Sequence, residues 1–225
     1  MNKKNISFKK LHKILDTKFN FDSWWPGDTK DEIFIGAILT QNTNWKNVEK
    51  AVFNLKEKGL LSLTLISKCN LKELEHAIKP SGFYHQKALR LKNSASYIIT
   101  NYTSLDNFFM KDTQLLRKEL LSLNGIGPET ADSILLYCAN KPIFVIDAYT
   151  KRITKRVFGN NEELTYEDLQ SIIHNEITPN AKEYKKFHGE LVELAKTNCK
   201  KEPTCTNCPI NQYCIYFLNE KKIIH

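Results

Sequence analysis

Apolar residues recur along most of the chain at intervals of three and four positions, the spacing of one face of an α-helix. Four segments show this most clearly: Ile33, Phe34, Ala37 and Ile38; Val48, Ala51, Val52 and Leu55; Ala131, Ile134, Leu135 and Cys138; and Leu191, Val192, Leu194 and Ala195. Alternating β-branched runs are few, and only 8 Gly and 7 Pro punctuate the 225 residues. The pattern therefore predicts an all-α protein with short loops.

One interruption lies between a helix expected to end near Leu121 and a helix expected to begin at Pro128, a residue suited to a first helical turn. Gly125 and Gly127 flank Ile126 there, so the backbone can turn sharply while Ile126 packs into the core. The bare amide N–H groups can approach an anion closely. The segment predicts a phosphate-binding turn, with a plain turn between helices as the alternative.

Asp147 follows the apolar segment 142–146 and precedes a helix expected over residues 148–153. We expect its carboxylate to cap that helix, where the helix dipole stabilises an anion. Taken alone, an ordinary capping aspartate is the alternative. Behind Asp147, four basic residues form two i,i+4 pairs that are phosphate contacts or a solvated face: Lys151, Arg152, Lys155 and Arg156.

This order of helix, hairpin, helix, loop and aspartate resembles the helix-hairpin-helix DNA glycosylases, from about Trp24 to Cys214. The resemblance implies a two-lobed, all-α fold. It places the hairpin in a six-helix lobe over residues 29–140, and it builds a second helical lobe from residues 1–28 and 141–225.

The resemblance also assigns roles to individual residues. In this family an aspartate at the place of Asp147 is the essential catalytic residue, and the hairpin holds the DNA backbone through Gly125, Ile126 and Gly127. The loop around Gln41 resembles the family's loop near the lesion. In relatives, a glutamine at this place enters the base stack where the target base has left.

Four cysteines near the end of the chain follow the spacing C-x5-C-x2-C-x5-C: Cys199, Cys205, Cys208 and Cys214. Four closely spaced thiols in a reducing compartment predict a metal site, for zinc or for an iron–sulfur cluster. The spacing resembles the [4Fe–4S] loop of the endonuclease III family, whose first gap is usually one residue longer. The resemblance implies a [4Fe–4S] cluster, and it makes Lys200 and Lys201 candidate contacts to the DNA backbone.

All 3 tryptophans lie near the start of the chain: Trp24, Trp25 and Trp45. An enzyme that acts on a base in a duplex must extrude that base and stack it in a pocket. We expect the three tryptophans to line this pocket with Glu129 at its wall, although core packing is the alternative for each one alone. Cation–π attraction of about 0.5–2 kcal/mol favours a cationic base there, such as an alkylated purine.

Glu129 lies two residues after the second hairpin glycine. In bifunctional relatives this position is a lysine that attacks the sugar and cleaves the strand, and a carboxylate cannot form that Schiff base. Together with residues 24–26, 39–43 and 80–84, Glu129 makes the chain resemble the 3-methyladenine DNA glycosylases of the endonuclease III superfamily. Characterised members of that type lack the four-cysteine loop, so the chain looks intermediate between that type and endonuclease III.

We therefore predict a monofunctional DNA glycosylase of base excision repair that hydrolytically releases an alkylated purine such as 3-methyladenine, without lyase activity. The alternatives within enzymes are an endonuclease III-like glycosylase and AP lyase for oxidised pyrimidines, and a mismatch glycosylase. Outside enzymes they are a non-catalytic DNA-binding module and a zinc protein unrelated to DNA.

Charge agrees with a polyanionic partner, because 33 Lys and Arg against 25 Asp and Glu give a net charge of +8. We expect this partner to be double-stranded DNA with a damaged base. No run approaches the roughly 18 apolar residues of a membrane span, and the N-terminus does not resemble a signal peptide. We expect a cytoplasmic monomer, associated with the nucleoid in a prokaryote.

Overall fold

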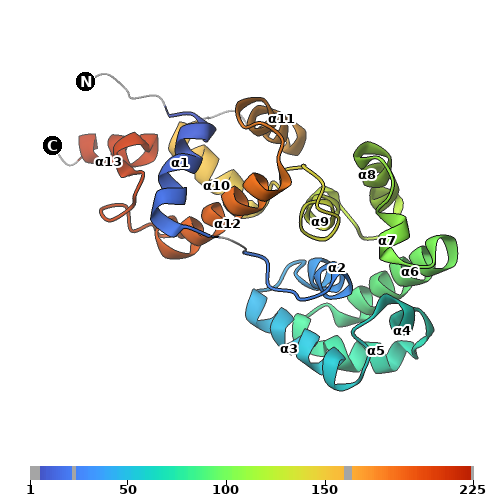
Figure 1. The fold of residues 1–225 in the computed structure, drawn as a ribbon. Helices are drawn as coiled ribbons and strands as arrows, with labels where there is room; N and C mark the ends of the chain where they lie inside the picture. Colours follow the sequence, from blue (N-terminus) through green and yellow to red (C-terminus); the bar gives the residue numbers. More distant parts are fainter. Residues whose placement is uncertain (1–5, 22–23, 160–163, 224–225) are drawn as a thin grey trace. The chain divides into compact units, whose positions relative to one another are not determined.

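A computed structural model of the protein describes residues 6–21, 24–159 and 164–223. These residues form helices and loops and no strand, which confirms the prediction of an all-α protein (Figure 1). The chain divides into two compact units. Pro26–Lys141 form the continuous unit, and Met1–Trp25 with Pro142–His225 form the composite unit. None of the described helices is both long and apolar enough to cross a membrane.

The continuous unit contains eight α-helices where the resemblance implied six, because serine residues at 62 and 104 begin two short additional ones, α4 and α7. In chain order the helices are α2 (Lys30–Leu39), α3 (Trp45–Glu57), α4 (Leu63–Lys68), α5 (Leu71–Ile78), the 3-10 turn η1 (Lys79–Ser81), α6 (Tyr84–Tyr102), α7 (Leu105–Phe108), α8 (Thr113–Ser122), α9 (Pro128–Ser133) and the π-helical segment η2 (Ile134–Cys138).

Helix α2 lies in the core of this unit, since six of its residues, from Phe34 to Leu39, are buried. It packs against α3, α6, α9 and η2, while α4 and α5 pack on α6. Polar side chains fix where the helices begin: Thr29 caps α2, Asn44 caps α3 and Asp112 caps α8. The unit thereby places the loop after α2, the first turns of α6 and the segment between α8 and α9 on a buried helical framework.

The composite unit contains α1 (Phe8–Phe19), α10 (Ala148–Phe158), α11 (Tyr166–Glu176), α12 (Ala181–Thr197), the 3-10 turn η3 (Asn211–Tyr213) and α13 (Ile215–Ile223). Helix α1 packs on α12, and α12 packs on α10. The two distant parts of the chain share one core, because the Phe8 ring lies 4.6 Å from that of Phe158 and 6.5 Å from that of Phe187. This core supports α12 and α10, and an aspartate lies at the start of α10.

Candidate functional site

The hairpin lies between α8, which ends at Ser122, and α9, which begins at Pro128, as the sequence predicts. Ile126 is 4% exposed, so it packs into the core as expected. Only Gly125 needs a glycine's backbone, with φ +81, whereas Gly127 has φ −91 and caps α9. The expectation that both glycines make the turn is therefore wrong for Gly127, whose conformation any residue adopts.

The two glycines also differ in their surroundings. A Cβ added to Gly125 would lie 2.2 Å from Nε of Arg90, a residue of α6. A Cβ added to Gly127 would meet nothing within 4 Å. Gly125 is required by the protein itself, whereas Gly127 is exposed and leaves open space beside its backbone.

Gln41 lies in the loop after α2, and its side chain is held against the hairpin. Its Nε2 donates to the carbonyl oxygen of Gly125 at 2.9 Å and to Thr130 Oγ1 at 3.0 Å. Its Oε1 accepts a hydrogen bond of 2.6 Å from Arg90 Nη1. The structure thus brings together Gln41 and the hairpin, two features that the sequence predicts separately, and Arg90 is a partner that sequence reasoning missed.

Lys87, one turn before Arg90 on α6, is a second residue that sequence reasoning missed. It is 1% exposed, and its Nζ donates to the carbonyl oxygens of Leu39 at 2.8 Å and Ser81 at 2.7 Å. Burial, with a contribution from Arg90, lowers the pKa of Lys87 to about 8. Lys87 therefore ties the loop that carries Gln41 to the loop that carries Phe83, an exposed aromatic residue with φ 46.

Asp147 caps α10, as predicted, and its Oδ1 accepts a hydrogen bond of 2.7 Å from the Thr150 amide. Its Oδ2 lies 3.6 Å from Nε2 of His188, a buried residue of α12. Burial raises the pKa of Asp147, but His188 and the hydrogen bonds with Thr150 lower it, and the net shift is below the ordinary value. The carboxylate is therefore held as an anion, and His188 is a further residue that sequence reasoning missed.

Trp24 and Trp25 lie in the composite unit, with ring centroids 6.1 Å apart in an edge-to-face arrangement. The Trp24 ring also meets His188 edge-to-face at 5.5 Å. It packs on Gly189 so closely that a Cβ there would lie 2.5 Å from Trp24 Cγ. Lys196 Nζ lies 5.7 Å from the same ring, within the range of a cation–π interaction. His188 in the middle of α12 thus joins Trp24 to the surroundings of Asp147.

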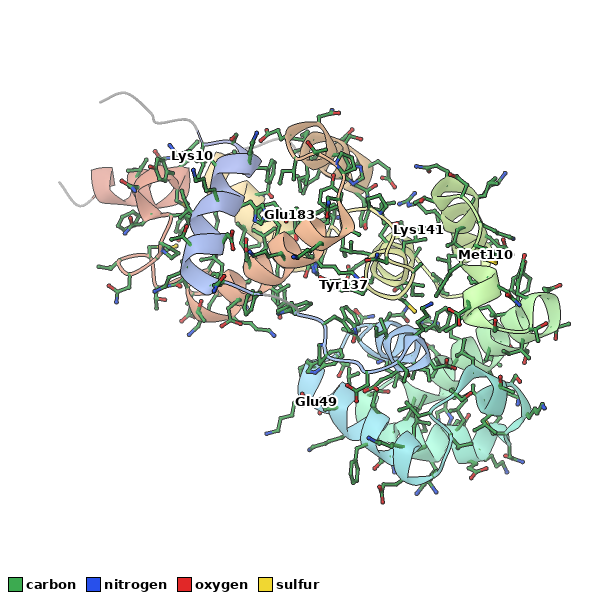
Figure 2. All side chains as sticks on the ribbon, in the orientation of Figure 1. Lys10, Glu49, Met110, Tyr137, Lys141 and Glu183 are labelled. Carbon is green, nitrogen blue, oxygen red and sulfur yellow. The ribbon has the colours of Figure 1, made fainter. Side chains whose placement is uncertain are left out.

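Trp45 begins α3 in the continuous unit and lines an open pocket of about 380 Å³. Three carboxylates line the same pocket, those of Asp28, Glu32 and Glu49, the last of which is labelled in Figure 2. The pocket therefore combines an indole ring with negative charge. Glu129 is exposed on the first turn of α9 and is not among the residues that line this pocket.

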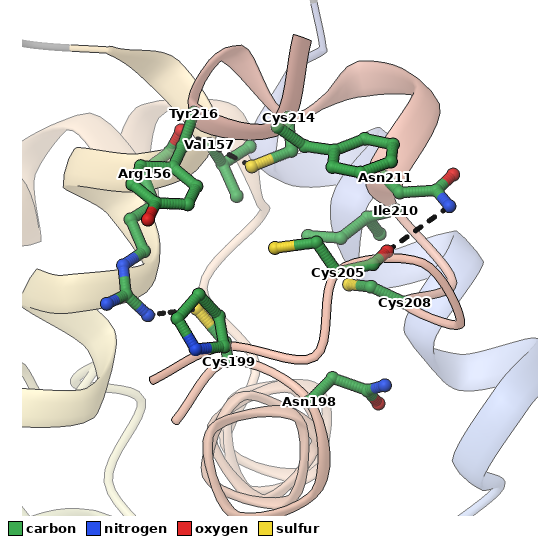
Figure 3. Close-up of a pocket in the computed structure, with 12 residues that line it drawn as sticks. Arg156, Val157, Asn198, Cys199, Cys205, Cys208, Ile210, Asn211, Cys214 and Tyr216 are labelled. Atoms are coloured by element: carbon green, nitrogen blue, oxygen red, sulfur yellow. Dashed lines mark hydrogen bonds between the residues drawn. The ribbon is translucent and has the colours of Figure 1, made fainter. Parts of the chain in front are cut away.

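The four cysteines line one pocket in the composite unit (Figure 3). Among the described residues, no group of three or more potential ligands is arranged to hold a single metal ion. Burial raises the pKa of Cys208 to about 11 and also raises that of Cys214. At both positions burial therefore favours the neutral thiol over the thiolate.

Arginine side chains of α10 hold this cysteine loop. Arg152 Nε donates to the carbonyl oxygen of Cys199 at 2.9 Å. Arg156 donates to the carbonyl oxygens of Lys200 at 2.5 Å and Lys201 at 2.9 Å, and it approaches Cys199 Sγ at 3.4 Å. The side chains of Lys200 and Lys201 are exposed. These two arginines therefore act within the protein, and the two lysines remain on its surface.

Comparison with known proteins identifies the family. Residues 35–179 match the model of the HhH-GPD superfamily of base excision DNA repair proteins. A protein of Methanocaldococcus jannaschii, provisionally named a DNA repair glycosylase, is 44% identical over 208 residues, which cover 92% of this chain and 94% of that protein.

Two solved structures show the same fold. A 3-methyladenine DNA glycosylase of Helicobacter pylori (MagIII), bound to 1,N6-ethenoadenine, is 32% identical with a TM-score of 0.76 and covers 85% of this chain and 98% of its own. A trapped endonuclease III–DNA covalent intermediate is 20% identical with a TM-score of 0.81 and covers 96% of this chain and 99% of its own. The chain belongs to the HhH-GPD superfamily of base excision DNA repair proteins.

Proposed function

We propose that this protein is a monofunctional DNA glycosylase that binds double-stranded DNA and hydrolytically releases an alkylated purine such as 3-methyladenine. The observation that carries the proposal is the Asp147 carboxylate, which is held as an anion at the start of α10. Base release leaves positive charge on the sugar in the transition state. A fixed carboxylate stabilises that charge or activates the attacking water.

DNA binding is supported by the hairpin and by the charge of the chain. The open space beside the exposed Gly127 suits a backbone phosphate, and the exposed Lys200 and Lys201 side chains suit further phosphates. We assign to Gln41 the place in the base stack that the target base vacates. To enter it, the Gln41 side chain exchanges its hydrogen bonds with Gly125, Thr130 and Arg90 for contacts with bases.

Two aromatic sites support a cationic substrate base. The Trp24 ring already attracts the ammonium group of Lys196, and Trp45 shares its pocket with three carboxylates. Alkylation of a purine ring nitrogen creates a positive charge that both environments favour, and it weakens the glycosidic bond. The likeness to the 3-methyladenine DNA glycosylase of Helicobacter pylori points to the same substrate class. We assign Trp24, Trp25, Trp45 and Glu129 to the recognition of this base.

The absence of lyase activity is proposed from Glu129, which occupies the place of the lyase lysine in bifunctional relatives. Lys141 is another amine near the catalytic aspartate in sequence, but its Nζ donates to the carbonyl oxygen of Lys111 at 2.9 Å. The rival activity is that of a glycosylase and lyase, as the trapped covalent intermediate of endonuclease III represents. Strand cleavage without added alkali distinguishes the two.

We also propose that Cys199, Cys205, Cys208 and Cys214 hold a [4Fe–4S] cluster. The support is the chemistry of the donors, since four cysteines line one pocket and four thiolates are the ligands of a [4Fe–4S] cluster. The Arg156 guanidinium beside Cys199 favours the anionic ligands that a cluster requires. Purified protein is expected to contain iron and sulfide, and stoichiometric zinc without iron would contradict the cluster.

The function is tested with duplexes that contain 3-methyladenine, 7-methylguanine, thymine glycol, uracil, or adenine opposite 8-oxoguanine. Base release is measured with and without alkali. We expect Asp147→Asn to lower release of 3-methyladenine by at least about a hundredfold. Asparagine caps a helix as well as aspartate does, so DNA binding should persist. Asp168→Asn is the matched control, because Asp168 completes the capping box of α11 in the same unit, where its carboxylate accepts a hydrogen bond from the Thr165 amide. Unchanged release by Asp147→Asn would refute the assignment.

A further inference from the structure

Arg90 is a cation without a carboxylate partner at the hairpin. Its side chain lies against Gly125, and no carboxylate of the described residues forms an ion pair with it. The neighbouring charge on α6, Lys87, has the same sign, and the charge of Arg90 contributes, after burial, to the lowering of the Lys87 pKa. Two adjacent positive charges without a counter-ion attract an anion.

The guanidinium also retains donors. One bond from Nη1 goes to Gln41, and the remaining N–H groups have no recorded acceptor among the described residues. Arg90 is half-buried and its stem lies against Gly125, so packing restricts the side chain while the residue keeps exposed surface. A guanidinium has five donors in a rigid fork that matches the oxygens of a phosphate.

The bond to Gln41 sets the direction of this fork. Gln41 Nε2 is itself held by Gly125 and Thr130, so the hairpin, Gln41 and Arg90 form a closed ring of contacts. If Gln41 moves into the base stack, Nη1 of Arg90 loses its acceptor. A phosphate oxygen can then replace the Gln41 oxygen at the same donor.

We propose that Arg90 is a DNA phosphate ligand of the hairpin, oriented by Gln41 before DNA arrives. The inference rests on the proposed function only in that the partner is DNA; it does not require base release. It adds a residue of α6 to a binding site otherwise formed by the segment between α8 and α9. It also makes phosphate binding by Arg90 and insertion of Gln41 favour each other. Insertion of Gln41 into the base stack frees Nη1 of Arg90 for a phosphate, and a phosphate bound at Nη1 replaces the hydrogen bond that holds Gln41.

The test is the salt dependence of binding to an undamaged duplex, measured by fluorescence anisotropy over a range of KCl concentrations. Each phosphate contact contributes about 0.9 to the slope of log Kd against log salt. We expect Arg90→Met to make this slope shallower by about 0.9. The ratio of the Kd of Arg90→Met to that of the wild type should therefore fall roughly threefold when the KCl concentration rises fourfold. Arg90→Lys keeps the charge and should keep most of the slope.

Lys92→Met is the matched control. Lys92 lies on the same helix and donates to the carbonyl oxygens of Ser67 and Cys69, so its removal deletes one charge and comparable hydrogen bonds. An equal change in slope for Lys92→Met, or none for Arg90→Met, overturns the proposal. If Arg90→Met does not fold, as thermal unfolding reports, Arg90→Gln replaces it. The duplex is undamaged, so a protein that binds DNA but releases no base refutes the proposed function and leaves this inference standing.

Discussion

The two hairpin glycines separate the requirements of folding from those of DNA binding, and alanine at each position tests this. In Gly125→Ala, an L-residue at φ +81 costs about 1–2 kcal/mol. Its Cβ also displaces Arg90, whose Nε lies 2.2 Å away, so the charged hydrogen bond to Gln41, worth about 1.5–3 kcal/mol, is lost. The sum is about 3–5 kcal/mol, a large share of the roughly 5–15 kcal/mol that stabilises a folded protein.

Gly127→Ala should behave in the opposite way. Its backbone needs no glycine, its Cβ meets nothing within 4 Å, and alanine in place of glycine at a helix cap costs at most about 1 kcal/mol. If a phosphate lies on the bare amides, the new methyl group occupies the space of that phosphate. We then expect binding of duplex DNA to weaken at least tenfold.

Thermal unfolding and fluorescence anisotropy with a fluorescent duplex distinguish the two variants. Gly125→Ala should melt roughly 10 °C lower, because 1 kcal/mol shifts the melting temperature of a chain of this size by about 2–4 °C. Gly127→Ala should melt close to the wild type and bind DNA poorly. A Gly127→Ala protein that is stable and binds DNA as well as the wild type would refute the phosphate-binding interpretation of the hairpin.

Two further variants test the interactions that support the site. His188→Gln removes a contact that lowers the pKa of Asp147, while the burial that raises this pKa remains. The acid limb of the pH profile of single-turnover base release should therefore move to higher pH, and an unmoved limb would refute this role of His188. Arg117→Met removes the hydrogen bonds of 2.7 and 3.0 Å that join Arg117 of α8 to Asp132 of α9, which is 0% exposed. Unfolding in urea should show that the free energy of unfolding falls by about 3–5 kcal/mol. For Lys30→Met, whose partner Asp106 is exposed, it should fall by less than about 1 kcal/mol.

The parts of the fold that follow local rules could be predicted from the sequence. The end of α8, the start of α9 and the cap at Asp147 depend on residues within a few positions of one another. The buried face at residues 131–138 was also predicted, although the second half of that segment is a π-helix. All residues of the π-helical segment are buried, so the 3.6-residue period of apolar positions could not distinguish a π-helix from an α-helix.

The residues that position the site could not be predicted, because their partners are distant in sequence. Lys87 bonds the carbonyl of Leu39, 48 residues away, and Arg90 bonds Gln41, 49 residues away. In sequence both are ordinary basic residues of an amphipathic helix. His188 likewise meets Asp147 only because α10 packs on α12. A lysine that is buried among main-chain carbonyls carries no local signal that separates it from a solvated one.

The basic residues of α10 show why net charge alone does not locate a DNA-binding surface. The sequence left their role open between phosphate contacts and a solvated face, and Arg152 and Arg156 are neither, since both bind carbonyls of the cysteine loop. Their charges are used to hold that loop, which leaves the exposed Lys200 and Lys201 as its candidates for DNA contact. Arg90 differs because its other donors have no recorded acceptor within the described protein. A cation is therefore a candidate for DNA contact when donors of its side chain have no acceptor within the protein, whatever its contribution to the charge of +8.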